Sequence, residues 1–228
     1  MTSDADLDRI YHRRFGEEDA RGKERVWKEI GRYLQRWVPA DGRVLDVAAD
    51  RGYFIRHITA AERWATDLRD VSASLGPDVR FIQVDGLSLS DAVPRDYFDV
   101  VFVSNYLEHL PNREAVIAQL VQIRGVLKHD GRLIVLQPNI RYVGAAYWDF
   151  IDHHVALTDR SLIEAATAAG FVVERLIPRF LPYTTKSRLP QSSWLVRGYL
   201  RFSPAWRVMG KQALLIARPS AGRTEPGP

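Results

Sequence analysis

A short apolar run followed by a turn of small and charged residues constrains the fold of this chain more than any other feature. Val44, Leu45 and Val47 predict a buried strand, and the turn follows at 48–52. Residues 54–61 then predict a short amphipathic helix. A strand, a tight turn and a helix start form the opening half of a βαβ unit, so the sequence predicts an α/β protein with a parallel sheet.

The turn and an acidic residue beyond it indicate a nucleoside ligand. Asp67 ends the next predicted strand about 20 residues after the turn, the spacing at which a carboxylate can accept both hydroxyls of a ribose. Dinucleotide sites place three glycines in this turn, so that a pyrophosphate can lie on the helix N-terminus. Here Ala48 and Asp50 replace two of them and only Gly52 remains. Because Asp50 would direct negative charge at a pyrophosphate, a ligand with a cationic or zwitterionic end fits better.

Five segments, in order, resemble the class I S-adenosylmethionine-dependent methyltransferases. Residues 44–52 resemble their first motif, and Asp67 matches the acidic residue at the end of their second strand. Residues 81–86, 98–110 and 126–135 resemble later strands, a loop and a helix of the same family. The ordered spacing of these segments makes the resemblance specific for the fold.

This resemblance implies an α/β, Rossmann-like class I methyltransferase fold, with S-adenosylmethionine as the cofactor. The sheet is expected to have seven strands, mostly parallel, with an antiparallel last strand inserted between its neighbours and helices on both faces. The expected segments are an N-terminal helical cap at 1–38, a methyltransferase domain at 39–218 and a frayed tail at 219–228. Within the domain, an irregular stretch at 138–157 and a long loop at 178–209 are expected to be substrate-side insertions.

Apolar periodicity and turn signals predict the individual elements. Helical spacing predicts helix over 5–38, interrupted at Gly16, and over 113–127. Thr158 is predicted to open a helix that covers 162–169. The predicted strands are 43–47, 63–66, 79–84, 98–103, 132–136, 171–177 and 210–218.

The cofactor is expected beyond the carboxyl ends of the strands, where ligands bind in open α/β sheets. The resemblance implies that Asp67 binds the ribose and that Asp85 faces the adenine amino group, while Asp46 is expected to order the turn. The expected cofactor-binding residues are Asp46, Ala48, Ala49, Asp50, Gly52, Asp67, Leu68, Asp85, Gly86, Leu87, Ser104, Asn105 and Tyr106.

Each of these carboxylates also has a structural alternative. Asp67 could cap a helix or form a salt bridge with Arg69, and Asp85 could simply form an Asp-Gly turn. Asp50 could accept a hydrogen bond from the ammonium group of the cofactor or cap a helix that starts at Gly52, and these two roles are compatible.

Two consecutive histidines are the candidate catalytic residues. Methyl transfer to oxygen needs a base, and histidine has a suitable pKa. His153 and His154 follow the fifth predicted strand, and Asp149 and Asp152 are near enough in sequence to orient an imidazole. We predict a His-Asp dyad with Asp149 as the carboxylate, the alternative being that the histidines only close the loop. His109 is a second candidate and is expected to be structural. No metal is expected, because consecutive histidines point in different directions and rarely share one ion.

The substrate side resembles a narrower group of proteins. Residues 137–142, 148–154 and 179–190 look like a bacterial subgroup of these methyltransferases that accompanies glycosyltransferases and cell-envelope or secondary-metabolite pathways. The resemblance implies methyl transfer to an oxygen or nitrogen of a sugar, glycolipid or small natural product. The alternative is a non-methylating member of the fold, acting as a scaffold partner or using only the charge of the cofactor. The expected substrate-binding residues are Tyr11, Arg14, Arg141, Tyr147, Trp148, Tyr183, Lys186 and Arg188.

Composition limits the cellular setting and the partners. The chain of 228 residues has no cysteine, which fits a reducing cytoplasm. Its polar N-terminus predicts no signal peptide, and no apolar run reaches the roughly 20 residues that cross a bilayer. From Arg175 onward basic and aromatic residues interleave, which favours either peripheral contact with an anionic membrane or a solvated basic face. No nucleic-acid reader motif accompanies this charge, so nucleic acid is not an expected partner, and the oligomeric state stays open.

Overall fold

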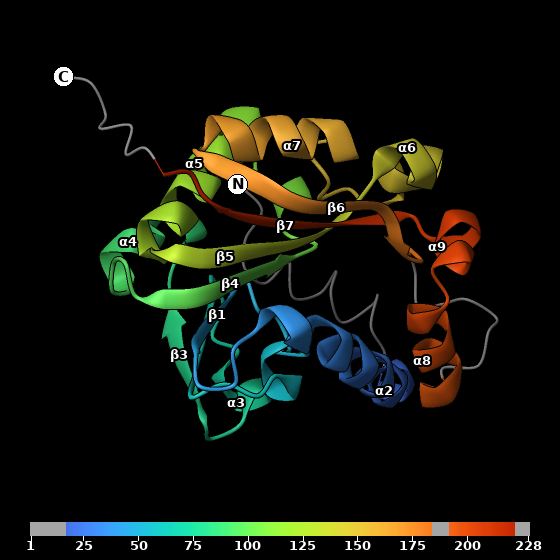
Figure 1. Ribbon diagram of the computed structural model, residues 1–228, viewed down its shortest axis with the longest axis horizontal. Helices are drawn as coiled ribbons and strands as arrows, with labels where there is room; N and C mark the ends of the chain where they lie inside the picture. Colours follow the sequence, from blue (N-terminus) through green and yellow to red (C-terminus); the bar gives the residue numbers. More distant parts are fainter. Residues whose placement is uncertain (1–16, 184–191, 222–228) are drawn as a thin grey trace.

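The computed structural model describes residues 17–183 and 192–221, and within them seven strands form one sheet. The strands are β1 (Arg43–Val47), β2 (Glu62–Asp67), β3 (Val79–Gln83), β4 (Phe98–Ser104), β5 (Leu127–Pro138), β6 (Phe171–Leu181) and β7 (Gln212–Pro219). Their order in the sheet is β3-β2-β1-β4-β5-β7-β6 (Figure 1). Strands β1 to β5 pair in parallel, whereas β7 runs antiparallel to both β5 and β6. The predicted mostly parallel sheet with an inserted antiparallel last strand is therefore confirmed.

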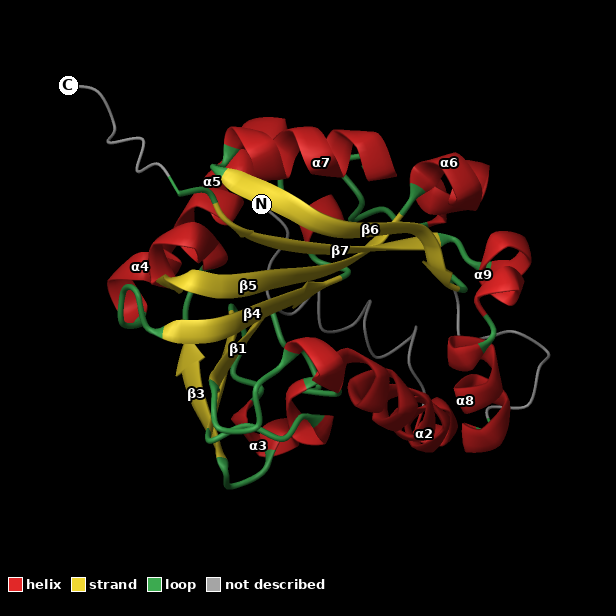
Figure 2. Cartoon of the chain, viewed as in Figure 1, coloured by secondary structure: helices red, strands yellow, loops and turns green. Residues whose placement is uncertain are grey.

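Helices cover both faces of the sheet. The α-helices are α2 (Glu17–Leu34), α3 (Ser72–Leu75), α4 (Leu89–Ala92), α5 (Arg113–Val126), α6 (Ile140–Val143), α7 (Asp159–Ala168), α8 (Ser193–Arg201) and α9 (Ser203–Met209). The 3₁₀ helices are η1 (Gln35–Trp37), η2 (Ile55–His57), η3 (Gly86–Ser88), η4 (Leu107–His109) and η5 (Gly144–Asp149). Helices α4, α5 and α7 lie on one face, and α2, α3 and α8 lie on the other (Figure 2).

Strand β4 shows how one sequence supplies both cores. Val101 and Val103 belong to the core under α5 and α7, whereas Val100 and Phe102 belong to the core under α2. Alternate side chains of a strand point to opposite faces, so a continuous apolar run fits only a strand that is covered on both sides. The central position of β4 in the sheet agrees with this pattern.

The predicted start of the helix after residue 158 is confirmed. Thr158 accepts a hydrogen bond from the Ser161 N–H through its side chain, and the Ser161 hydroxyl accepts one from the Thr158 N–H. This reciprocal pair forms a capping box that satisfies two backbone donors at the start of α7. Gly170 follows the helix with a φ of 80°, a left-handed conformation that suits glycine.

The predicted helix over residues 54–61 is wrong. Only the three residues of η2 are helical, and the backbone becomes extended at Ile58. The chain leaves the helix because Gln35 binds the backbone of Thr59 in both directions: its Oε1 accepts from the Thr59 N–H at 2.9 Å, and its Nε2 donates to the Thr59 carbonyl at 2.9 Å. A short helix is marginal by itself, so one such side chain can end it.

The two segments predicted to be substrate-side insertions, an irregular stretch and a long loop, contain regular structure. Residues 140–149 form α6 and η5, and the side chain of Asn139 caps α6. Residues 178–181 belong to β6, whose final residue pairs with β7 beyond an irregularity in the register. The remainder of 178–209 that the structure describes forms α8 and α9. These helices are only four to nine residues long, and such short helices depend on tertiary contacts that a sequence pattern does not reveal.

Candidate functional site

The turn after β1 keeps the backbone of a glycine-rich turn with only one of its three glycines. Ala48, Asp50 and Gly52 have φ values of 55°, 48° and 65°, all in the left-handed region. The turn is closed by a hydrogen bond from the Gly52 N–H to the Ala49 carbonyl, 2.8 Å, and is tied to β2 by one from the Ala49 N–H to the Thr66 carbonyl, 3.0 Å. Aspartate tolerates this conformation better than alanine does, because its short polar side chain can hydrogen-bond locally.

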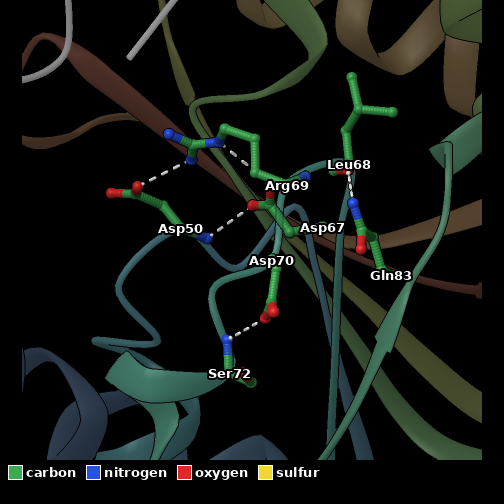
Figure 3. Close-up of polar contacts among 7 residues, drawn as sticks. All are labelled: Asp50, Asp67, Leu68, Arg69, Asp70, Ser72 and Gln83. Carbon is green, nitrogen blue, oxygen red and sulfur yellow. Dashed lines mark hydrogen bonds and ion pairs between the residues drawn. The ribbon is translucent and has the colours of Figure 1, made fainter. Parts of the chain in front are cut away.

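Asp67 joins the turn to the segment after β2. Its Oδ2 accepts from the Asp50 N–H at 2.9 Å, and its Oδ1 accepts from the Arg69 N–H at 3.0 Å (Figure 3). The Arg69 guanidinium bridges two carboxylates, with Nε 3.3 Å from Asp67 Oδ1 and Nη2 2.9 Å from Asp50 Oδ1. The salt-bridge alternative for Asp67 is therefore present. The helix-cap alternative for Asp50 is wrong, because no α-helix begins at Gly52.

Asp46 adds a third carboxylate to this edge of the sheet. It is buried, and burial raises its pKa well above the ordinary value, helped by the neighbouring charges of Asp67 and Asp50. A hydrogen bond from the Ile55 backbone N–H acts in the opposite direction. The carboxylate thus binds the backbone after the turn, in agreement with its predicted ordering role. The charges of Asp50 and Asp67 repel a charge on Asp46, and such a concentration of acidic groups favours a cation at this edge of the sheet.

Asp85 and Gly86 form the next part of the edge, after β3. Asp85 Oδ1 accepts from the Leu87 N–H at 2.9 Å and so caps η3, which is the predicted turn alternative. A Cβ on Gly86 would lie 2.4 Å from the Tyr106 hydroxyl and 2.3 Å from Gln119 Oε1. Any larger residue there would force the side chains of Tyr106 and Gln119 to shift, because both distances are shorter than real Cβ contacts.

Tyr106 connects the loop after β4 to helix α5. Its hydroxyl donates to Gln119 Oε1 at 3.0 Å. Burial raises its pKa, and the carboxylates of Asp85 and Asp67 add to the shift, which places all three groups in one electrostatic environment. Gln119 is fully buried and was missed by sequence reasoning, since it looks like any polar residue of an amphipathic helix.

The remaining cofactor candidates lie along the same edge. Asn105 has a φ of 47°, and its side-chain amide donates to Ser104 Oγ at 2.8 Å. Its backbone N–H donates to the Leu136 carbonyl at 2.9 Å, which fixes the loop to β5. Leu68 is half-exposed beside Asp67, and Leu87 packs against the core under α5.

The predicted His-Asp dyad is not formed. His153 is buried and its Nδ1 lies 2.7 Å from the Tyr147 carbonyl, whereas His154 and Asp149 are exposed. Among the described residues, Asp149 makes no hydrogen bond with either histidine. Burial lowers the pKa of His153, against an opposing effect of the buried Glu108 carboxylate. His153 is therefore held as a neutral imidazole next to an acidic group that sequence reasoning missed.

His109, predicted to be structural, lies beside His153. The two ring centroids are 5.0 Å apart, and His109 Nδ1 is 2.8 Å from the Asp152 carbonyl oxygen. Glu108, His109 and His153 together offer one ligand atom each, all within 4.8 Å of one another. Their closeness could not be predicted, because it depends on how the loops after β4 and β5 meet.

The predicted substrate-binding residues lie in different environments. Tyr147 is fully buried and its hydroxyl donates to the Val155 carbonyl, so it holds the loop together. Arg141 lies 3.6 Å from the Asp159 carboxylate, and Trp148 is exposed. The Tyr183 ring contacts that of Phe150 edge-on, with centroids 6.0 Å apart. Tyr11, Arg14, Lys186 and Arg188 lie outside the described residues.

Known proteins share both the sequence pattern and the fold. A family model described as "Methyltransferase domain" matches residues 12–176. The ubiquinone/menaquinone biosynthesis C-methyltransferase UbiE of Burkholderia mallei is 32% identical over 128 residues, which cover 51% of each chain. The chain thus spans about half the length of the curated relatives it matches.

Two solved structures have the same fold at low sequence identity. One is a putative methyltransferase from Haloferax volcanii in complex with the activator Trm112, with a TM-score of 0.64, 16% identity and coverage of 90% of this chain and 95% of that one. The other is a SAM-dependent methyltransferase from Archaeoglobus fulgidus, with a TM-score of 0.59, 18% identity and coverage of 83% and 92%. The family model matches residues 12–176, which is more than half of the chain, and the strand order agrees with it. This chain therefore belongs to the methyltransferase-domain family, with the class I architecture.

Proposed function

We propose that this protein is a methyltransferase that uses S-adenosylmethionine. The observation that carries the proposal is the acidic edge of the sheet, where Asp46, Asp50 and Asp67 gather around a left-handed turn. S-Adenosylmethionine combines a ribose with a sulfonium and an ammonium group and has no phosphate. Its charge suits an edge of carboxylates, which would repel a pyrophosphate.

The residues on this edge fit the parts of that cofactor. Asp67 would hold the ribose, because a carboxylate oxygen can accept further hydrogen bonds beside those from Arg69 and Asp50. Asp85 has one oxygen that is not used in capping and would face the adenine amino group. Gly86, which packs closely against Tyr106 and Gln119, would support the adenine ring. When bound, the cofactor supplies an electrophilic methyl group, and the protein contributes mainly positioning.

The proposed acceptor is an oxygen or nitrogen of a sugar, glycolipid or small natural product. Trp148 offers an exposed aromatic surface, and sugar rings and other flat apolar groups bind such surfaces. The similarity to UbiE, named as a C-methyltransferase of quinone biosynthesis, adds a carbon acceptor to the compounds worth testing. Incubation with candidate acceptors should release the demethylated cofactor only when the correct class is present.

Binding of the cofactor by calorimetry tests the proposal directly. The wild-type protein should bind S-adenosylmethionine or its demethylated product at micromolar concentration, and Asp67→Ala should abolish binding. Asp70→Ala is the matched control, because Asp70 is exposed and binds Ser72, whose N–H donates to it at 3.0 Å and whose side chain also bonds to it. If Asp67→Ala binds the cofactor as tightly as Asp70→Ala does, the ribose role is refuted.

One observation favours the second candidate, a non-methylating member of the fold. The Arg69 guanidinium already bridges Asp50 and Asp67, so the positive charge that the edge attracts is partly supplied by the protein itself. A binding or scaffold partner in a biosynthetic complex would need no cofactor there. A well-folded wild-type protein that binds neither S-adenosylmethionine nor its product would favour this candidate over the first.

We also infer that helices α8 and α9 contact an anionic membrane surface. Trp194, Phe202 and Val208 are 72%, 62% and 77% exposed, and the exposed residues Arg201 and Arg207 directly precede Phe202 and Val208 in the sequence. Exposed aromatic and aliphatic groups beside basic ones are typical of surfaces that lie on anionic headgroups. Among the described residues, no helix has both the length and the apolar character needed to cross a bilayer.

Vesicle co-sedimentation tests this contact. The protein should sediment with vesicles that contain phosphatidylglycerol and stay in solution with phosphatidylcholine alone. The double variant Arg201→Glu, Arg207→Glu should lose the effect, whereas Arg160→Glu, an exposed change on α7, should keep it. Equal sedimentation of all three proteins would refute the assignment of the surface.

A further inference from the structure

We propose that Glu108, His109 and His153 form a binding site for a divalent transition-metal ion of the zinc type. Two elements bring them together: η4, which follows β4, contributes the first two, and the loop after η5 contributes His153. One ligand atom from each residue lies within 4.8 Å of the others. Two histidines and one carboxylate are an established ligand set for such ions.

The geometry needs only a small adjustment to hold an ion. Three atoms that are at most 4.8 Å apart have a common point no further than about 2.8 Å from each, and ligand distances to zinc are about 2.0–2.2 Å. Each ligand atom would therefore move by roughly 0.7 Å or less, which side-chain rotation allows.

The hydrogen bonds of the two histidines leave the correct nitrogens for binding. His109 Nδ1 is 2.8 Å from the Asp152 carbonyl oxygen, and His153 Nδ1 is 2.7 Å from that of Tyr147. A carbonyl can only accept, so each Nδ1 carries a proton, and in the neutral imidazole it is Nε2 that would present its lone pair to an ion. Metal-binding histidines usually donate their other nitrogen in this manner, which fixes the tautomer and the ring orientation.

Glu108 supplies an independent reason for an ion. Its side chain is only 1% exposed, and its Oε2 accepts from Gln137 Nε2 at 2.8 Å. Within residues 17–183 and 192–221, no lysine or arginine pairs with it, and His109 Nε2 lies 4.0 Å from Oε1. A buried carboxylate is costly without a cation, and a metal ion at this point would compensate its charge.

The backbone holds the two loops in register. The N–H groups of His154 and Val155 both donate to the Glu108 carbonyl, at 2.8 and 3.1 Å. The cluster therefore does not depend on loose side chains alone. It also lies at the carboxyl ends of β4 and β5, the same edge of the sheet that carries Asp67 and Tyr106.

The position of the ion suggests the class of acceptor, and this step rests on the proposed function. Three protein ligands leave room in the coordination sphere for oxygen atoms of a substrate. The acceptor would be a compound with adjacent oxygens, such as a vicinal diol or a hydroxy-carbonyl group. Coordination lowers the pKa of a bound hydroxyl, whose proton would pass to water.

Metal binding by the protein alone tests the site. Protein treated with a chelator and then freed of it should bind zinc chloride with a stoichiometry of one in calorimetry, and cobalt chloride should give the visible absorption of an ordered cobalt site. Glu108→Gln and His153→Ala should each weaken binding about 100-fold or more. His154→Ala and His129→Ala are matched controls, because both histidines are exposed and lie outside the cluster.

The outcomes separate the two proposals. Absence of one-to-one binding by the wild-type protein would overturn the metal site, as would unchanged affinity in Glu108→Gln and His153→Ala or an equal loss in the controls. Affinity for S-adenosylmethionine is measured in the same samples. A protein that binds zinc and not the cofactor would refute the proposed function while it supports the metal site, and the reverse result would do the opposite.

Discussion

Replacement of Ala48 by glycine should stabilise the protein, although substitution by glycine usually destabilises. Ala48 has a φ of 55°, and this left-handed conformation costs a non-glycine residue roughly 1–2 kcal/mol. Glycine removes that cost but gains about 0.5–1 kcal/mol of conformational freedom in the unfolded chain. The net gain in the free energy of unfolding is about 0.5–1 kcal/mol.

Thermal and chemical unfolding measure this gain. For a domain of this size, 1 kcal/mol corresponds to about 2–4 °C, so Ala48→Gly should raise the Tm by about 1–4 °C. Denaturation by urea should move to a higher midpoint with an unchanged slope, because the surface exposed on unfolding stays the same.

Ala49 provides a control in the same turn. Its φ is not in the left-handed region, and it is buried, so glycine relieves no strain there and removes a packed methyl group. Ala49→Gly should therefore lower stability by about 1–2 kcal/mol. A Tm for Ala48→Gly at or below that of the wild-type protein, or equal shifts for both variants, would refute the claim that the turn is strained.

Three further predictions concern the cofactor edge and the helices beside it. Gly86→Ala should cost about 1–3 kcal/mol in denaturant unfolding, because its Cβ meets the side chain of Gln119, and the double variant with Gln119→Ala should recover part of the loss if the contact is the cause. Asp46→Asn should raise the free energy of unfolding at neutral pH by about 1–3 kcal/mol, because the folded protein raises the pKa of Asp46. The stability that Asp46 contributes is complete below its pKa in the unfolded chain and is lost as pH rises through its pKa in the folded protein. The difference between variant and wild type should therefore vanish near pH 3 in thermal unfolding. Glu29 has a lowered pKa, mainly because Arg197 donates to it at 3.0 Å. The stability that Glu29 contributes is therefore present above its pKa in the unfolded chain and is lost as pH falls through its pKa in the folded protein. Arg197→Ala should flatten the pH dependence of the Tm in that acidic range, and an unchanged profile would contradict the assignment.

The sequence was sufficient where local pattern and position in the sheet determine the structure. The apolar run at 98–103 could only be a strand covered on both faces, and β4 is one. Asp67 follows a predicted strand, so its place at the edge of the sheet was also predictable. Whether Asp67 forms a salt bridge with Arg69 could not be decided from the sequence, because side chains two positions apart on an irregular segment can point either toward or away from each other.

The parts that could not be predicted depend on contacts between distant segments. The helix predicted over 54–61 is missing because Gln35, about twenty residues earlier, binds the backbone of Thr59. Similarly, His153 lies beside Glu108 and His109, which belong to η4 after β4, and not beside its sequence neighbour Asp149. Proximity in sequence suggested a dyad, whereas two loops meeting in space produced a different cluster.

The place of β7 in the sheet has a consequence for assembly. It is the last of the seven described strands, yet it lies between β5 and β6 and hydrogen-bonds to both, so within residues 17–183 and 192–221 no other strand lies beside β6. A chain that ends before residue 212 cannot complete the sheet: β5 would keep one edge unpaired and β6 would have nothing to join. Folding on the ribosome must therefore wait until β7 has emerged, and nascent chains that end before this strand would expose two strand edges that invite aggregation.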